Sequence, residues 1–175
     1  MNGKQWDDLF GSFAKKRVDK QRAEDEERAL ISWYDEQAKQ VMSMVSELMR
    51  ERSATFERAT GVRVEVKSPS RPPINVAPEG PFMSFIAISL GMREVHMYSH
   101  RLGANAPAIH YVVTGDASQQ SRKRVQARAG CRIEQRPGGG FQLRDAALGA
   151  SDQHAELNVD DVAFRGFELL LAEGN

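Results

Sequence analysis

The segment from Phe82 to His100 decides the fold of this chain, and it reads FMSFIAISLGMREVHMYSH. Its first half, residues 82–90, is apolar on both faces, which is typical of a central strand covered on both sides. Residues 93–100 follow after Gly91 and Met92 alone, so the two runs predict an antiparallel hairpin. The sheet around this hairpin is therefore expected to be antiparallel.

Further strands are predicted on either side of the hairpin. Before it, Val62, Val64 and Val66 alternate with charged residues, and a loop containing four prolines at 68–80 separates them from Phe82. After it, apolar alternation indicates strands at 108–114, 122–136 and from Phe141 onward. Pro137 and the three glycines that follow it predict the turn between the last two. The sequence thus predicts an antiparallel meander of about six strands.

The first 60 residues predict a long helix, because they contain no proline and consist mostly of helix-forming residues. We expect Gly11 to interrupt this helix and Gly61 to end it. An apolar stripe with steps of three and four residues comprises Ile31, Tyr34, Ala38, Val41, Val45 and Leu48. Met42, Met44 and Met49 widen the stripe, which favours packing on a sheet over a free coiled coil. A homodimer through the stripe remains the alternative.

A second helix is predicted near the C-terminus, with Asn158 as its N-cap and Asp160 and Asp161 in its first turn. Its apolar side comprises Val162, Ala163, Phe167, Leu170 and Leu171. Both helices are expected to cover the same face of the sheet. The expected fold class is α+β, with residues 1–28 as a charged helical arm and residues 29–175 as a single domain.

Composition restricts the function classes. The 175 residues carry 24 basic and 24 acidic side chains, so the neutral chain as a whole does not attract nucleic acid or anionic lipid. Its single cysteine, Cys131, rules out a disulfide framework and is expected to be a buried, unreactive thiol. The N-terminus lacks the pattern of a secretory signal, and no apolar run is long enough to span a membrane. A cytoplasmic protein without membrane insertion is the expectation.

Residues 122–136 form the most conspicuous candidate surface. If they form one strand, its even face presents Arg122, Arg124, Arg128, Arg132 and Arg136, and its odd face presents Val125, Ala127, Ala129, Cys131 and Ile133. The odd face is expected to be buried. The arginines could bind nucleic-acid phosphates or an acidic protein surface, although no aromatic residue interleaves with them for base stacking. Alternatively, they are solvated or pair with the acidic run at 24–27.

A second candidate surface carries histidines. Glu94, His96, Tyr98 and His100 share one face of their strand, and His110 follows on the next. His96 and His100 would stand about 13 Å apart and cannot bind one ion, whereas His100 and His110 could meet across strands at about 5 Å. Ordinary exposed histidines are the simpler interpretation, so we predict no metal or cofactor. A small-ligand or enzymatic site on this face remains an alternative.

The third candidate is the N-terminal amphipathic segment with Trp6, Leu9, Phe10 and Phe13, followed by basic residues. Such a segment can dock into the groove of a partner. The chain contains no nucleophile elbow, no Walker-type glycine loop and no zinc-protease helix motif. We therefore expect a non-enzymatic protein-interaction protein that uses this segment and the exposed sheet face. Nucleic-acid binding through the arginine strand is the main alternative.

Overall fold

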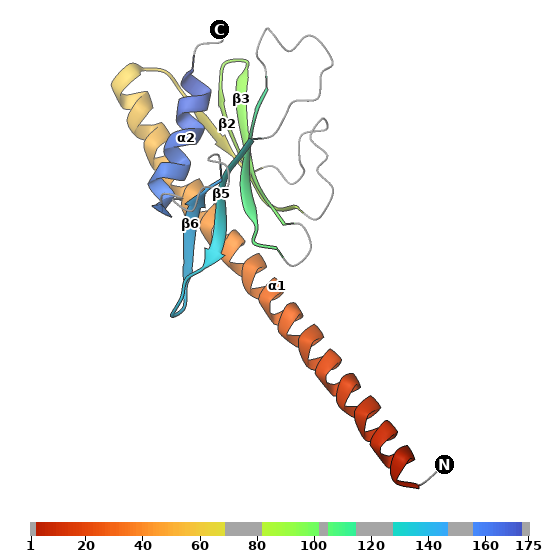
Figure 1. Cartoon of the computed structure of the whole chain (residues 1–175). Helices are drawn as coiled ribbons and strands as arrows, with labels where there is room; N and C mark the ends of the chain where they lie inside the picture. Colours follow the sequence, from red (N-terminus) through yellow and green to blue (C-terminus); the bar gives the residue numbers. More distant parts are fainter. Residues whose placement is uncertain (1–2, 69–81, 102–104, 115–127, 147–155, 173–175) are drawn as a thin grey trace. The chain divides into compact units, whose positions relative to one another are not determined.

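The chain adopts an α+β fold, which confirms the class expected from its sequence. The computed structural model describes residues 3–68, 82–101, 105–114, 128–146 and 156–172 (Figure 1). The elements in these ranges are α1 (Gly3–Thr60), β1 (Glu65–Lys67), β2 (Phe82–Leu90), β3 (Arg93–His100), β4 (Ala108–Thr114), β5 (Arg128–Gln135), β6 (Phe141–Asp145), β7 (Glu156–Leu157) and α2 (Val159–Leu171). The chain divides into two compact units, one ending at Trp33 and one beginning at Tyr34.

The described strands form one antiparallel meander, in which each strand pairs with its neighbours in the sequence. The predicted hairpin is present, with Leu90 opposite Arg93. Gly91 in its turn has a φ of +60°, which glycine adopts without steric cost. The bounds predicted for β2, β3 and β4 are confirmed. The seventh strand, β7, was not predicted, because its two residues are too few to show a periodic pattern.

Both helices cover the same face of the sheet, as predicted (Figure 1). The stripe of α1 lies on the sheet, since Ala38, Val41 and Val45 are fully buried in a core shared with the strands. Met42 and Met49 are buried with them, whereas Met44 is exposed. The strands contribute alternate residues to this core, including Ile86, Ile88, Val95, Met97, Ile109, Tyr111, Cys131, Ile133 and Leu143.

The expected interruption of α1 at Gly11 is wrong, because the helix runs through this residue. Glycine within a helix costs about 1 kcal/mol relative to alanine, which reduces its stability without forcing a break. The predicted end at Gly61 is confirmed. Its φ is +72°, and its N–H donates to the Glu57 carbonyl at 2.8 Å.

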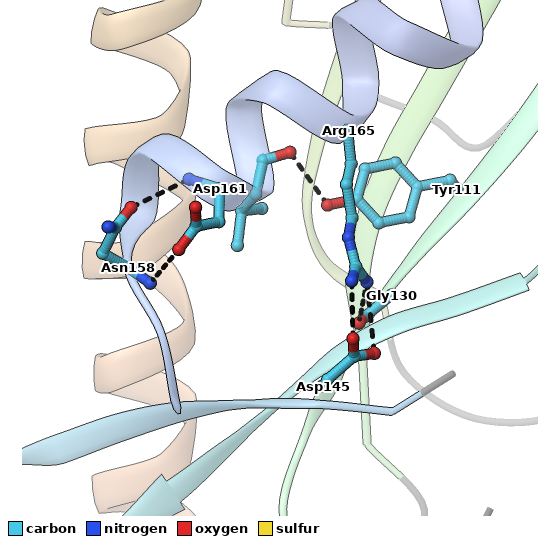
Figure 2. Close-up of polar contacts among 7 residues, drawn as sticks. Tyr111, Gly130, Asp145, Asn158, Asp161 and Arg165 are labelled. Carbon is cyan, nitrogen blue, oxygen red and sulfur yellow. Dashed lines mark hydrogen bonds and ion pairs between the residues drawn. The ribbon is translucent and has the colours of Figure 1, made fainter. Parts of the chain in front are cut away.

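The N-terminus of α2 has the predicted cap. The Asn158 side chain accepts a hydrogen bond from the Asp161 N–H at 2.9 Å, and the Asp161 carboxylate accepts one from the Asn158 N–H at 2.8 Å (Figure 2). This reciprocal capping box satisfies two backbone donors that a helix end would otherwise leave unpaired. The cap sets the residue at which α2 begins.

Two sets of polar contacts hold α2 on the sheet (Figure 2). The Tyr111 hydroxyl of β4 donates to the Val162 carbonyl at 2.9 Å. The Arg165 guanidinium donates to both carboxylate oxygens of Asp145, at 3.2 and 2.5 Å, and to the Gly130 carbonyl at 3.0 Å. The hydrogen bond with Asp145 raises the pKa of Arg165, and burial raises the pKa of Tyr111. Both groups therefore keep their protons and remain donors at neutral pH.

Candidate protein-interaction surfaces

The apolar face predicted near the N-terminus is present in α1 and exposed to solvent. Trp6, Leu9, Phe10 and Phe13 have exposed fractions of 44, 56, 62 and 68%. Their spacing of three and four residues places them on one side of the helix. The ring centroids of Trp6 and Phe10 lie 5.7 Å apart, so these two side chains are neighbours on the helix surface. We call residues 6–13 the aromatic segment.

Charged residues between positions 20 and 28 form ion pairs within their own helix. Arg22 lies 2.9 Å from Glu26, and Arg28 lies 3.6 Å from Asp25. Lys20 lies 3.7 Å from Glu24. These i, i+3 and i, i+4 pairs support the exposed helix. They also give Glu24, Asp25 and Glu26 of the acidic run partners within the same helix.

An apolar groove between α1 and α2 is a surface that the sequence patterns did not lead us to expect. It encloses about 540 Å³ and is lined by Arg52, Thr55, Phe56, Ala59, Asp160, Asp161, Ala163, Phe164, Phe167 and Leu171. Phe164 is 63% exposed, and Leu171 is also exposed. Large apolar side chains left exposed in a concave surface are typical of binding sites. We call this surface the α1–α2 groove.

Charged residues border the α1–α2 groove at the N-terminus of α2. Arg52 of α1 lies 3.1 Å from Asp160, and both side chains are more than half exposed. Asp161 adds a second carboxylate beside them. The charged residues that line the groove are Arg52, Asp160 and Asp161, so the net charge of its lining is −1. The groove is apolar along its length and acidic at this end.

A second apolar stripe of α2 is the local sequence signal for this groove. Phe164, Phe167 and Leu171 follow one another at steps of three and four residues. Phe167 also packs against the core, whereas Leu171, expected on the side that packs on the sheet, is exposed. A helix that packs on one surface needs a single apolar stripe, and this second stripe indicates another contact surface. Phe56 completes the groove from α1, and only the three-dimensional structure brings it to α2.

The structure describes only part of the predicted arginine strand, as β5 from Arg128 to Gln135. Arg122, Arg124, Val125 and Ala127 lie outside the described residues. Cys131 and Ile133 are fully buried, which confirms the expectation for the odd face at these two positions. Arg132 and Arg136 are exposed.

A β-bulge at Gly130 interrupts the alternation on which a single arginine face depended. Ile109 of β4 pairs with Cys131, but the next residue, His110, pairs with Ala129. In the backbone register, Tyr111 is paired with Arg128 and Ala108 with Arg132, so five residues of β5 span four residues of β4. An extra residue in one strand shifts the pleat by one position. The expected unbroken alternation of the strand through Gly130 is therefore wrong.

Acidic neighbours offset part of the positive charge near this strand. Arg136 forms an ion pair with Glu156 of β7, and Arg144 of β6 lies 3.0 Å from Glu134. Exposed pairs of this kind contribute only about 0–1 kcal/mol each to stability. Their effect here is to reduce the net positive potential that a phosphate backbone would meet.

The histidine face is more buried than predicted. His96, Tyr98 and His100 are at most 9% exposed, so the expectation of exposed strand histidines is wrong for β3. β3 lies between β2 and β4 and is not an edge strand of the described sheet. This part of the sheet does not provide the open face that we expected to be available for binding.

The rings on this face pack across the strands. Tyr98 lies opposite His110, and their rings stack with centroids 5.2 Å apart. The ring of His100 lies 5.9 Å from that of His110, which confirms that these two histidines meet across strands. Burial lowers the pKa of His110 to about 4, with repulsion from His100 as a second cause. His110 is therefore a neutral, packed imidazole at neutral pH.

A metal-binding cluster is not found in the described part of the chain. His96 is 2.8 Å from Glu94, but no group of three His, Cys, Asp or Glu side chains in the described residues could hold a metal ion. Burial raises the pKa of Cys131 to about 12, so this thiol is protonated at neutral pH. Within the same ranges, no helix combines the length and the apolar character needed to cross a membrane.

Comparison with protein families, with curated proteins and with solved structures finds no match to this chain. We therefore infer function from the surfaces described above.

Proposed function

We propose that the protein is a protein-interaction module that binds its partner through the aromatic segment of α1. The observation that carries this proposal is the exposure of Trp6, Leu9, Phe10 and Phe13 on one side of a helix. A helix with this spacing of large apolar residues is the ligand in helix-in-groove recognition. Tryptophan is enriched among the residues that dominate binding energy at interfaces.

Removal from water is the driving force for such binding. Large apolar side chains contribute about 1.5–3 kcal/mol each when they become fully buried. The aromatic segment holds four of them in two helical turns, and each is 44–68% exposed. A monomeric protein gains no stability from exposing such a row of apolar side chains to water. A partner that buries these four side chains therefore binds with a gain in hydrophobic free energy.

The other two surfaces support this function less well. The buried packing of His96, Tyr98 and His100 argues against the exposed sheet face as the binding surface, so we place the interaction on the helices. The bulge at Gly130 and the ion pairs of Arg136 and Arg144 give no specific support to nucleic-acid binding.

The experiment compares three full-length tagged chains by affinity capture after cross-linking in the source cells. They are the intact chain, the double variant Phe10→Asp/Phe13→Asp, and a control, Val18→Asp. Val18 is 66% exposed on the same helix but lies outside the aromatic segment. We expect the intact chain and the control to capture the same partner and the double variant to lose it. Capture of the same partners by all three chains would contradict the proposal.

A further inference from the structure

We propose that the α1–α2 groove of one copy of this protein binds the aromatic segment of a second copy. The inference rests on the proposed function, because it names the partner of the aromatic segment. It also assigns an occupant to a groove that the function above does not use. The resulting contact joins two identical chains through different surfaces.

The dimensions of the two surfaces match. A helix rises about 1.5 Å per residue, so the wall of the groove from Asp160 to Leu171 is about 16 Å long. The stretch from Trp6 to Arg17, which contains the aromatic segment and the basic residues after it, has the same length. The groove lies between two helices and is lined by Phe56, Phe164 and Phe167. A third helix with a row of aromatic side chains is the shape that such a groove accepts.

The charges of the two surfaces are opposite. Asp160 and Asp161 stand at one end of the groove, with Arg52 as the single basic residue of its lining. Lys15, Lys16 and Arg17 follow closely after Phe13, the last residue of the aromatic segment. Opposite charges at matching ends favour one docking direction and disfavour the reverse.

This pattern predicts the orientation of the bound helix. Phe10 and Arg17 are separated by about 10 Å along their helix, and so are Phe167 and Asp160 along α2. If the segment binds antiparallel to α2, its basic end meets Asp160 while Phe10 lies near Phe167. Trp6 is then directed toward the end of the groove that Leu171 lines.

A second copy is a better occupant than the same chain. Residues 14–51 connect the aromatic segment to the groove-lining residues of the same chain. This stretch belongs to one helix and contains neither glycine nor proline, the residues at which helices break most readily. Binding to a second copy leaves the helix intact. Reciprocal exchange between two copies would close the assembly as a dimer.

Light scattering on purified full-length chains tests the proposal through complementation. The segment variant Phe10→Asp/Phe13→Asp retains an intact groove, and the groove variant Phe164→Asp retains an intact segment. Met92→Asp is the control, because Met92 is 90% exposed in the β2–β3 turn and outside both surfaces. Circular dichroism checks that each chain is folded, and Leu171→Asp replaces Phe164→Asp if that variant does not fold.

We expect the intact chain and the control to have twice the mass of one chain. Each of the two surface variants should be monomeric on its own, and their equimolar mixture should again form a complex of two chains. An intact chain that stays monomeric at all concentrations would overturn the proposal, as would a folded groove variant that still dimerises. Loss of self-association alone would leave the proposed function standing, provided that the aromatic segment still captures a different protein.

Discussion

The ring of Tyr111 lies against the backbone of Gly130, so that a Cβ atom at residue 130 would stand 1.9 Å from Tyr111 Cε2. This contact exists because the bulge of β5 leaves room for the ring, whose hydroxyl then reaches the Val162 carbonyl of α2. Since α2 forms one wall of the α1–α2 groove, the absence of a side chain at Gly130 helps to determine the shape of a distant surface.

Replacing Gly130 with alanine should destabilise the protein, because the methyl group and the Tyr111 ring cannot occupy the same space. Overpacking of this kind costs about 1–3 kcal/mol, measurable as a lower free energy of unfolding in urea. Gly11→Ala is the matched control. A Cβ atom there meets no other atom within 4 Å, and alanine should stabilise the helix by about 1 kcal/mol. Equal stability of Gly130→Ala and the native chain would refute the steric explanation.

The pair of Arg165 and Asp145 should be needed for α2 to stay on the sheet. Asp145→Ala leaves a partly buried guanidinium without its carboxylate, and breaking a buried pair costs about 3–5 kcal/mol. We expect the lower end of that range, because the Arg165 side chain is about a third exposed. The double variant Asp145→Leu/Arg165→Met removes both charges and should recover much of the loss. A double variant less stable than Asp145→Ala would contradict this interpretation of the pair.

The stability of the protein should decrease as the pH falls from about 6.5 to about 4, through the contribution of His110. In the unfolded chain this imidazole takes up a proton near pH 6.5, whereas the folded chain holds its pKa at about 4. The unfolded state therefore binds more protons across this range. The loss of stability is on the order of 2–3 kcal/mol.

Urea titrations at the two ends of this pH range measure the effect. His110→Phe is the comparison, since a phenyl ring can keep the stack on Tyr98 but cannot take up a proton. The variant should lose less stability than the native chain on acidification. Identical pH dependence of the two chains would show that His110 is not the group responsible.

Cys131 should react slowly with thiol reagents as long as the protein is folded. The side chain is fully buried, and burial raises its pKa to about 12. At pH 8 almost no thiolate is present to attack a disulfide reagent, and thiolate is the reactive form. Labelling followed by absorbance should be fast in urea and strongly suppressed in buffer. Rapid labelling of the folded chain would place this thiol at an accessible, activated position instead.

The sequence predicted those parts of the fold that depend on local periodicity. Alternation placed Cys131 and Ile133 on the buried face of β5, and the pattern around Asn158 marked the start of α2. These predictions succeed because hydrophobic periodicity and helix capping depend on residues that are close together in the sequence.

Features that depend on distant residues were not predictable in the same way. The bulge at Gly130 shows only in the pairing of β5 with β4, which brings together residues distant in the sequence. The burial of His96 could not be derived from the alternation of residues along β3. The α1–α2 groove depends on Phe56 and Phe164 coming together from separate helices. Each of these requires the tertiary arrangement, and only the second apolar stripe of α2 gives a local indication.

The fluorescence of Trp6 tests most directly whether binding buries the aromatic segment. In a Trp33→Phe variant, Trp6 is the only tryptophan of the chain. We expect its emission to move to shorter wavelength as the protein concentration rises, and Phe164→Asp to abolish this shift. Emission typical of a water-exposed indole at every concentration, with and without the Phe164 change, would contradict the docking of the segment in the groove of a second copy.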